Sequence, residues 1–403
     1  MGEKFLRLTP DTAFSRLGSA FQAQTNRLYR ERDARIGRGE PVIDLISGNV
    51  TEHGIRFPQS VLDPIWRDAA RKTRVYRPHP LGQPAAREAI SSYYRSLGLT
   101  IPSDRILLTP GTSLAYWYVF SILCDPDDEV LTPRPSYPLF DDIARMAHVR
   151  LVSYRLEESR DWAIDLADLE AKVSPRTRAI VLVSPHNPTG AVAAEDEIRG
   201  IAEIAARRSL PVIVDEVFGE FIFGRDALPR PAATGAPLVF TLNGFSKMFA
   251  LPGLKLGWIA LSGDDGLVRQ AVTALETVSD AFLPVNETVQ ASAPAIFREG
   301  NAFLTRYRKE ITRRRDATIE ALTDRPALGF VPPRGGFYIA IRVASPVSLD
   351  DEELALHVLR STGCLVHPGF FYDLDPTHLV VSLVSDPAVS GPALRSLAGA
   401  LAR

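Results

Sequence analysis

Residues 241–258 read T-L-N-G-F-S-K-M-F-A-L-P-G-L-K-L-G-W and place Lys247 between two apolar runs, at 237–242 and 256–261. Runs of this length and composition are typical of buried strands. A lysine at the carboxyl edge of a sheet, partly withdrawn from water, has a lowered pKa and can act as a Schiff-base nucleophile. Lys255 follows a Pro-Gly turn that can bring a second positive charge to the same anion. The alternative is a solvated loop lysine, and the rest of the chain must decide between the two.

Composition excludes several classes of partner. The chain has 403 residues with 46 basic and 48 acidic side chains, and its net charge of -2 offers no field for nucleic acid or an anionic membrane. Cys124 and Cys364 lie far apart in apolar runs, which indicates buried free thiols in a reducing compartment and no metal site. No segment approaches the roughly 20 apolar residues that span a bilayer, and the N-terminus has no signal-peptide core. We therefore expect a cytoplasmic protein.

The middle of the chain alternates strand-like runs with helical patterns. The expected strands lie at 106–109, 129–132, 149–153, 179–183, 211–214, 238–242 and 256–261. This alternation is typical of an α/β domain with a mostly parallel sheet that helices cover on both faces.

The flanking segments predict a second, smaller domain. Residues 13–36 have apolar positions at helical spacing and predict one N-terminal helix. Long amphipathic helices and short strands follow the parallel region, which is the pattern of a separate α+β domain. We expect an N-terminal arm with a small-domain segment at 1–47, a large domain at 48–290 and a small C-terminal domain at 291–403.

The loops after the expected strands carry the candidate site, because open α/β sheets bind ligands beyond the carboxyl ends of their strands. Gly111, Thr112 and Ser113 open an apolar helix, where backbone N–H groups and hydroxyls can hold a phosphate against the helix dipole. An ordinary capped helix is the alternative explanation for this loop.

Two further loops present an amide and an acid. The prolines and glycine of S-P-H-N-P-T-G, at 184–190, aim the amide of Asn187 at one place, although an ordinary loop is the alternative. Asp215 ends a hydrophobic strand and is followed by Glu216. A buried acid needs a partner, and a ring nitrogen that must carry a proton would supply one.

Taken together, these motifs resemble a known family. T-x-G-T-S, P-S-Y-P, S-P-H-N-P-T-G, D-E-V-F, S-K and P-G-L-K-L-G-W occur in the order found in the class I and II aminotransferases. These are fold type I enzymes that depend on pyridoxal 5'-phosphate, and the resemblance covers about residues 40 to 400. The segments N-G-F-S-K and P-S-Y-P-L-F are most similar to the alanine aminotransferase branch. The resemblance implies a large domain with a mostly parallel sheet, a smaller α+β domain and an amino substrate.

The resemblance also implies roles for individual residues. Lys247 would form the Schiff base with the cofactor and shuttle the proton at the substrate carbon. Asp215 would keep the pyridine nitrogen protonated, which makes the ring an electron sink. Asn187 would hydrogen-bond the ring oxygen, and Tyr137 would lie against the ring face.

Other matching positions would hold the phosphate and line the substrate pocket. The implied phosphate ligands are Thr112, Ser113, Ser246 and Lys255, next to Gly111. Tyr76 matches a tyrosine that reaches the phosphate of the neighbouring subunit, which implies a homodimer with shared active sites. Gly48 and Asn49 match the strand end that lines the substrate pocket.

Some positions depart from the family pattern. Phe218 stands where many relatives have a tyrosine, so it cannot donate to the ring oxygen and the pKa of the Schiff base should rise. Lys255 replaces an arginine and offers the phosphate one point charge in place of a bidentate fork. The arginine that clamps the substrate α-carboxylate in the family matches Val380 or its neighbour Val381.

We therefore expect an aminotransferase-like enzyme whose substrate has its carboxylate bound unusually or lacks one. Arg334, in P-P-R-G-G-F-Y, is the first candidate to bind a carboxylate, and Arg77 with His79 of a neighbouring subunit is the second; a solvated turn arginine is the alternative for Arg334. Elimination, decarboxylation or oxidation are alternatives, because the ring stabilises any carbanion at the reacting carbon. A cofactor-binding regulatory domain is a further alternative, which the lack of a basic DNA-binding segment disfavours.

Overall fold

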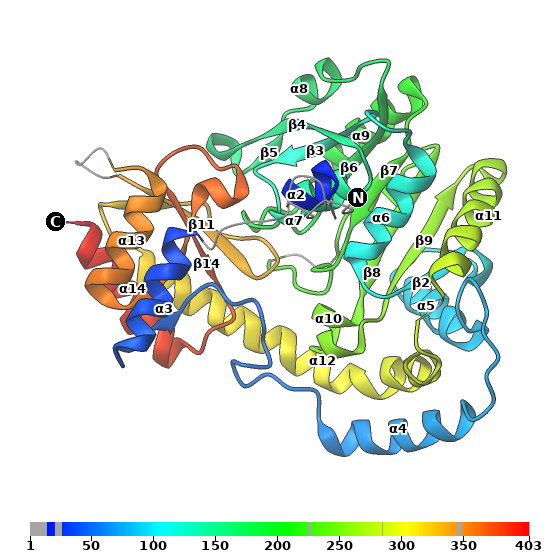
Figure 1. Cartoon of the computed structure of the whole chain (residues 1–403), viewed down its shortest axis with the longest axis horizontal. Helices are drawn as coiled ribbons and strands as arrows, with labels where there is room; N and C mark the ends of the chain where they lie inside the picture. Colours follow the sequence, from blue (N-terminus) through cyan, green and yellow to red (C-terminus); the bar gives the residue numbers. More distant parts are fainter. Residues whose placement is uncertain (1–13, 21–25, 225–226, 284, 345–348, 403) are drawn as a thin grey trace, which may run out of the picture.

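A large mixed sheet forms the core of the larger part of the protein (Figure 1). The computed structural model describes residues 14–20, 26–224, 227–283, 285–344 and 349–402. The sheet has eight strands. In spatial order they are β2 (Ile106–Thr109), β9 (Gly257–Gly263), β8 (Leu238–Gly244), β7 (Val212–Asp215), β6 (Thr177–Val183), β3 (Glu129–Arg134), β4 (Arg150–Glu157) and β5 (Ala163–Ile164).

The central strands of this sheet are parallel, as the sequence predicts. β4, β3, β6, β7 and β8 pair in parallel, whereas β9 is antiparallel to both of its neighbours and β5 is antiparallel to β4. The expected strands coincide with β2, β3, β4, β6, β7, β8 and β9 to within a few residues. The short edge strand β5 was not predicted.

Helices cover both faces of the sheet, and the strands alternate between two cores. Val212 and Val214 face one core, and Ile213 between them faces the other. This alternation follows from the two-residue repeat of a strand. The helices of this part are α4 (Gln59–Lys72), α5 (Pro84–Ser96), α6 (Thr112–Leu123), α7 (Leu139–Met146), α8 (Leu166–Ala171), α9 (Glu195–Arg208), α10 (Phe245–Met248) and α11 (Asp265–Phe282).

A second, antiparallel sheet lies at the other end of the molecule, with orange to red colours in Figure 1. Its strands are β10 (Leu328–Phe330), β11 (Tyr338–Val343), β14 (His378–Ser382) and β13 (His367–Pro368), with helices α13 (Asp351–Thr362) and α14 (Pro387–Leu401). β1 (Ile43–Asp44) pairs in parallel with β12 (Cys364–Leu365). The segment before the large sheet therefore lies beside the C-terminal part.

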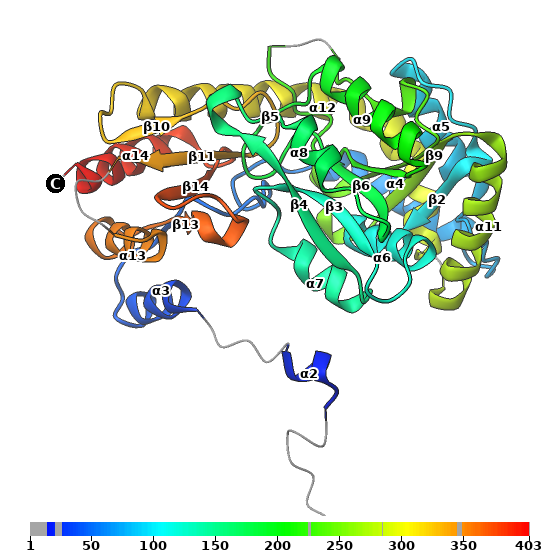
Figure 2. The ribbon, with the colours of Figure 1, turned by 90° about the horizontal axis from the view of Figure 1, so that it is seen from above.

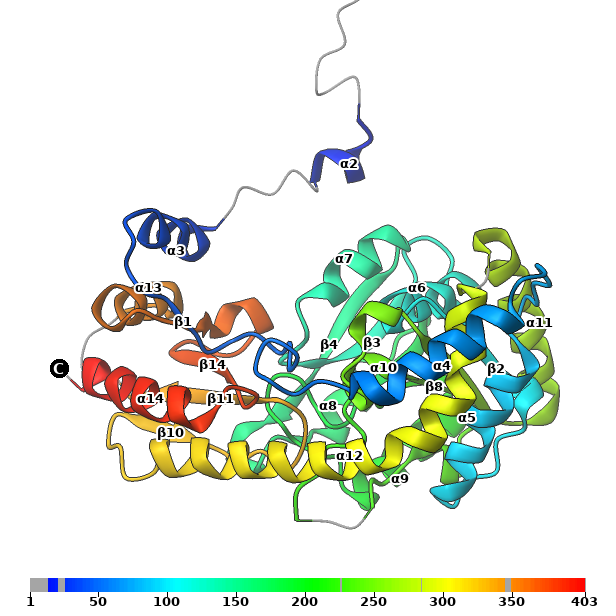
Figure 3. The same cartoon turned by 90° about the horizontal axis from the view of Figure 1, so that it is seen from below.

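One long helix connects the two parts. α12 (Glu287–Leu322) packs against α4 and α5 at one end and against α14 at the other. Figures 2 and 3 show it running along both sheets. The predicted domain boundary at 290–291 falls within the first turn of this helix. No helix of the described residues is long and apolar enough to cross a membrane.

The N-terminal region differs from the expected single helix over 13–36. The structure describes two helices there, α2 (Arg16–Ala20) and α3 (Arg27–Gly37), while residues 13 and 21–25 lie outside the described part. Asn26 has an extended backbone, and its side chain accepts a hydrogen bond from Tyr29 N at 2.9 Å. The prediction was wrong because an asparagine cap starts a new helix at this point.

Candidate active site

The predicted polar loops meet at one edge of the large sheet. β6, β7 and β8 are parallel neighbours, so the residues that follow their carboxyl ends lie close together. They enclose a cavity of about 200 Å³. The predicted residues that line it are Thr112, Ser113, Tyr137, Asn187, Asp215, Phe218, Ser246 and Lys247.

Lys247 lies in the short helix α10, directly after β8. Its Nζ donates to the carbonyl oxygen of Gly48 at 3.2 Å. The rings of Phe218 and Phe337 have their centroids 5.8 and 5.7 Å from this nitrogen. Burial lowers the pKa of Lys247 to about 8. A larger share of free amine is therefore present at neutral pH, which is what a Schiff-base nucleophile needs.

Asp215 is the last residue of β7 and is buried. Its two carboxylate oxygens accept hydrogen bonds from Val217 N at 2.8 Å and from the Tyr116 hydroxyl at 2.9 Å. Burial raises the pKa of Asp215 to about 6, and these hydrogen bonds oppose the rise only in part. Within the described chain no basic side chain pairs with this acid. A cationic ring nitrogen would supply the missing partner.

Asn187 presents an unsatisfied polar atom to the same cavity. Its Oδ1 is buried and has no hydrogen-bond partner among the described residues. Buried polar side-chain atoms are nearly always hydrogen-bonded, so an orphan atom beside a cavity indicates a ligand that completes it. The neighbouring His186 is engaged within the loop, where its Nδ1 lies 2.9 Å from Thr189 Oγ1.

The start of α6 presents its N-terminal turn to the cavity. Gly111 has a φ of 100° and precedes the helix, and no side chain caps its N-terminal N–H groups. Thr112 and Ser113 occupy the first turn, and Ser246 lines the cavity from α10. Free N–H groups and three hydroxyls around one helix N-terminus suit a phosphate.

Gly48 and Gly111 adjoin the lining residues Lys247 and Thr112, and four further predicted residues lie outside the cavity of this chain. Lys255 is exposed and has a left-handed backbone with a φ of 51°. Tyr76 is 69% exposed. The Asn49 Oδ1 is used locally, since it accepts from Thr51 Oγ1 at 2.7 Å.

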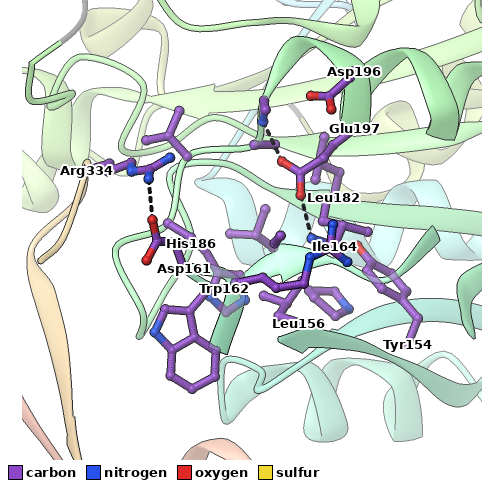
Figure 4. A pocket seen from close by; sticks show the side chains of 18 residues that line it. Tyr154, Leu156, Asp161, Trp162, Ile164, Leu182, His186, Asp196, Glu197 and Arg334 are labelled. Carbon is purple, nitrogen blue, oxygen red and sulfur yellow. Dashed lines mark hydrogen bonds and ion pairs between the residues drawn. The ribbon is translucent and has the colours of Figure 1, made fainter. Parts of the chain in front are cut away.

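Arg334 is the fourth of these residues, and its predicted position is corrected by the structure. Its Nη2 lies 2.6 Å from Asp161 Oδ2, in a separate cavity beside Trp162 (Figure 4). The backbone N of Arg334 donates to Gly190 O at 2.8 Å. The backbone is therefore held against the Asn187 loop while the side chain extends to the ion pair, away from Lys247.

Two tyrosines that line the cavity were missed at the sequence level. Tyr116 lies four residues after Thr112, so the helical repeat places both on one face of α6, and this spacing could have revealed it. Tyr338 begins β11 in the small sheet. No local signal reveals Tyr338, because its position depends on how the small sheet packs beside the large one.

The fold and this site define a class of protein. A parallel sheet that ends in a buried lysine, a buried acid and a helix N-terminus suits pyridoxal 5'-phosphate enzymes of fold type I, and the solved neighbours described below have that fold. Residues 40–396 match the family model described as aminotransferase class I and II, so the chain belongs to this family. Its members use pyridoxal 5'-phosphate.

Individual relatives agree with this assignment. The glutamate-pyruvate aminotransferase AlaA of Escherichia coli (strain K12) is 29% identical over 340 residues, which covers 82% of this chain and 83% of that protein. The tyrosine aminotransferase of Dictyostelium discoideum is 26% identical over 307 residues, 74% of each chain. Among solved structures, an alanine aminotransferase from Pyrococcus furiosus superposes with a TM-score of 0.88 at 25% identity and covers 93% of this chain and 96% of that one.

Proposed function

We propose that this aminotransferase holds its cofactor through the residues that converge on the cavity. Lys247 forms the covalent link, Asp215 pairs with the ring nitrogen, and Asn187 binds the ring oxygen. The unpaired Asp215 supports its own assignment, and the Asn187 amide lies in the same cavity, where its Nδ2 can donate to the ring oxygen. When bound, the cofactor supplies an electron sink for the carbanion next to the amine.

The remaining contacts follow from the shape of the cavity. The N-terminus of α6, with Gly111, Thr112 and Ser113, binds the phosphate together with Ser246. Tyr137 lies at the mouth, 37% exposed, where a ring can pack against its face. As a free amine, Lys247 would hold the proton that moves at the substrate carbon, since its pKa of about 8 allows it to accept one.

A homodimer is part of this proposal. Tyr76 and Arg77 lie in an exposed extended segment between α4 and α5. Exposure of a large aromatic side chain, together with its neighbour Val75 at 60%, favours a surface that a second copy covers. In such a dimer Tyr76 reaches the phosphate of the partner's site, and Arg77 comes near its entrance.

The substrate is an amino compound with an unusual carboxylate arrangement. The relatives named above act on amino acids, but Lys247 is the only cation that lines the cavity among the described residues. Val380 and Val381 are fully buried apolar residues. Burial of a carboxylate without a paired cation is unfavourable. The protein therefore favours a donor whose carboxylate is missing or is bound by the partner subunit.

One observation supports the reaction more than any other. The buried Lys247, with its lowered pKa, lines the same cavity as Asp215, a buried acid that forms no ion pair with a described residue. The test is to load the purified protein with pyridoxal phosphate and to treat it with borohydride. We expect a visible absorbance band and a stable adduct on Lys247. Lys247→Ala should fold and lose both, and Lys172→Ala, which replaces a lysine remote from the cavity, should keep both. An adduct that survives in Lys247→Ala would contradict the assignment.

A donor screen then separates aminotransfer from the alternatives. Retention of the donor nitrogen on the cofactor identifies aminotransfer. Release of ammonia or carbon dioxide with the original spectrum restored would instead identify elimination or decarboxylation on the same site.

A further inference from the structure

The side of the cavity next to Lys247 is lined by the phenol of Tyr338. Tyr338 lines the cavity, and no described residue forms a hydrogen bond with its hydroxyl. A Cβ added to Gly48 would lie 2.2 Å from Tyr338 Oη and 3.6 Å from Lys247 Nζ. Gly48 therefore lies between the hydroxyl of Tyr338 and the amine of Lys247. Tyr338 and Lys247 therefore line the same part of the cavity.

Strand register places Tyr338 on the same sheet face as Val380. Tyr338 and Ala340 are two residues apart on β11, so their side chains project from the same face. Ala340 lies directly opposite Val380 on β14, which places Val380 on that face as well. β13 pairs with the other edge of β14, and there His367 lies directly opposite Val380. No cation projects from the face next to Tyr338 at these positions.

Neutral hydroxyls occupy the space around this face. His367 Nδ1 lies 2.9 Å from the Tyr372 hydroxyl, and its Nε2 lies 2.7 Å from the Tyr29 hydroxyl. The backbone carbonyl of Tyr372 accepts from Ser136 N at 2.7 Å, which anchors it to the loop that carries Tyr137. We call Tyr29, Tyr338, Tyr372 and His367 the tyrosine cluster.

Every member of the tyrosine cluster is uncharged at neutral pH. Burial raises the pKa of Tyr338 and of Tyr372 and lowers the pKa of His367 to about 4. One charged group acts on both Tyr338 and His367, namely Asp44, whose negative charge raises the pKa of each. A carboxylate placed here would lose water and be repelled by Asp44, and the one cation nearby, Lys247, is the residue assigned to the cofactor. An uncharged polar group would keep its hydrogen bonds without these costs.

We propose that Tyr338, supported by the tyrosine cluster, selects a donor that carries an uncharged hydrogen-bonding group where an ordinary amino acid carries its carboxylate. Amino alcohols and amino amides fit this description. The inference rests on the proposed aminotransfer. In the half-reaction the C–N bond of the donor is replaced by a carbonyl whose oxygen comes from water. The nitrogen and the two electrons remain on the cofactor.

The test compares three donors that differ only at this group. Alanine, alaninamide and 2-aminopropan-1-ol are added separately to the holoenzyme, and the loss of the visible band is followed. We expect alaninamide and the amino alcohol to react with a higher kcat/KM than alanine. Tyr338→Phe should lower kcat/KM for these two donors by about five- to tenfold, as for one lost hydrogen bond, and should leave alanine unchanged. Tyr118→Phe is the matched control, since this buried hydroxyl has no partner among the described residues and lies outside the cavity.

A binding measurement separates this inference from the reaction itself. Lactamide and lactate lack the amine, and their dissociation constants are measured from shifts in the spectrum of the holoenzyme. We expect tighter binding of lactamide, and loss of that preference in Tyr338→Phe but not in Tyr118→Phe. The preference is independent of turnover, so it can be measured even if no donor reacts.

Two results would overturn the inference. The first is a holoenzyme that prefers alanine and lactate, with the preference lost in Arg77→Gln, which would assign carboxylate binding to the partner subunit. The second is a preference for lactamide that Tyr338→Phe does not change. Either result would leave aminotransfer intact, whereas loss of the Lys247 adduct alone would remove the proposed function.

Discussion

Asp215 and Lys247 both have pKa values shifted against their charged forms. Burial raises the pKa of Asp215 to about 6 and lowers the pKa of Lys247 to about 8. These shifts mean that the folded chain by itself disfavours the charged form of each group. Groups shifted in this way concentrate at functional sites, where a ligand compensates for them. The stability of the cofactor-free protein should therefore improve when such a group is neutralised.

The variant Asp215→Asn tests this expected gain in the stability of the cofactor-free protein at neutral pH. In the folded protein the pKa of Asp215 is about 6, above the ordinary aspartate pKa of 3.8. The folded state therefore binds more protons between these values, and wild-type stability falls relative to the variant as pH rises from about 4 to 6. Above pH 6 the cofactor-free variant should be more stable by roughly 1–3 kcal/mol, while its affinity for pyridoxal phosphate falls.

Urea unfolding at several pH values measures this difference. Asp316→Asn, an exposed control, should change stability by less than about 0.5 kcal/mol. If Asp215→Asn destabilises the cofactor-free protein at pH 7, burial is not what controls this carboxylate.

The segment after β7 is the element that positions Asp215 and Phe218. A buried ion pair anchors it, with Arg230 Nε 2.9 Å from Glu216 Oε2 and side-chain exposures of 7% and 1%. Glu216 N also donates to Leu242 O at 2.9 Å, which ties the segment to β8. Buried pairs of this kind hold a backbone in place because the loss of either partner leaves the other as an uncompensated buried charge.

Glu216→Gln should therefore destabilise the protein by about 3–5 kcal/mol, because Arg230 is left buried without a counter-charge. The double variant Glu216→Gln/Arg230→Met should recover part of that loss. Urea unfolding of the single and double variants measures the coupling. Glu299→Gln, which breaks the exposed pair with Arg298, is the control and should cost less than about 1 kcal/mol. Additive effects of the two buried substitutions would show that the pair is not coupled.

At the scale of the whole molecule, each active site draws on distant parts of the chain. Gly48 comes from the segment beside the small sheet, Lys247 from the large one, and Tyr338 from β11. α12 connects the two parts as a continuous helix. Tyr76, exposed in a single chain, is assigned to the site of a partner subunit.

Mixed dimers test that assignment. Tyr76→Ala and Lys247→Ala should each have little or no activity alone. If the sites are shared, a mixed dimer contains one site with Lys247 from one subunit and Tyr76 from the other, both intact. Unfolding and refolding the two variants together should therefore restore activity. The control mixes Lys247→Ala with Asp215→Asn, which act in the same chain, and no recovery is expected. Equal results for both mixtures would place Tyr76 in its own chain's site.

The sequence by itself determined the large sheet and the core of the site. Strand alternation and length predicted β6, β7 and β8 closely. Asn187, Asp215 and Lys247 each lie within a few residues of the strand that positions them, so parallel pairing alone brings them together. Their convergence was predictable because it depends on short connections.

Only the tertiary structure decided which side chain of P-P-R-G-G-F-Y faces the cofactor cavity. The sequence favoured Arg334, yet its side chain pairs with Asp161, and Tyr338, four residues later, lies beside Lys247. The cause is long-range. The register of β11 against β14 sets the face on which Tyr338 projects, and packing of the small sheet near the large one brings that face to the cavity. Neither contact is encoded in the spacing of nearby residues.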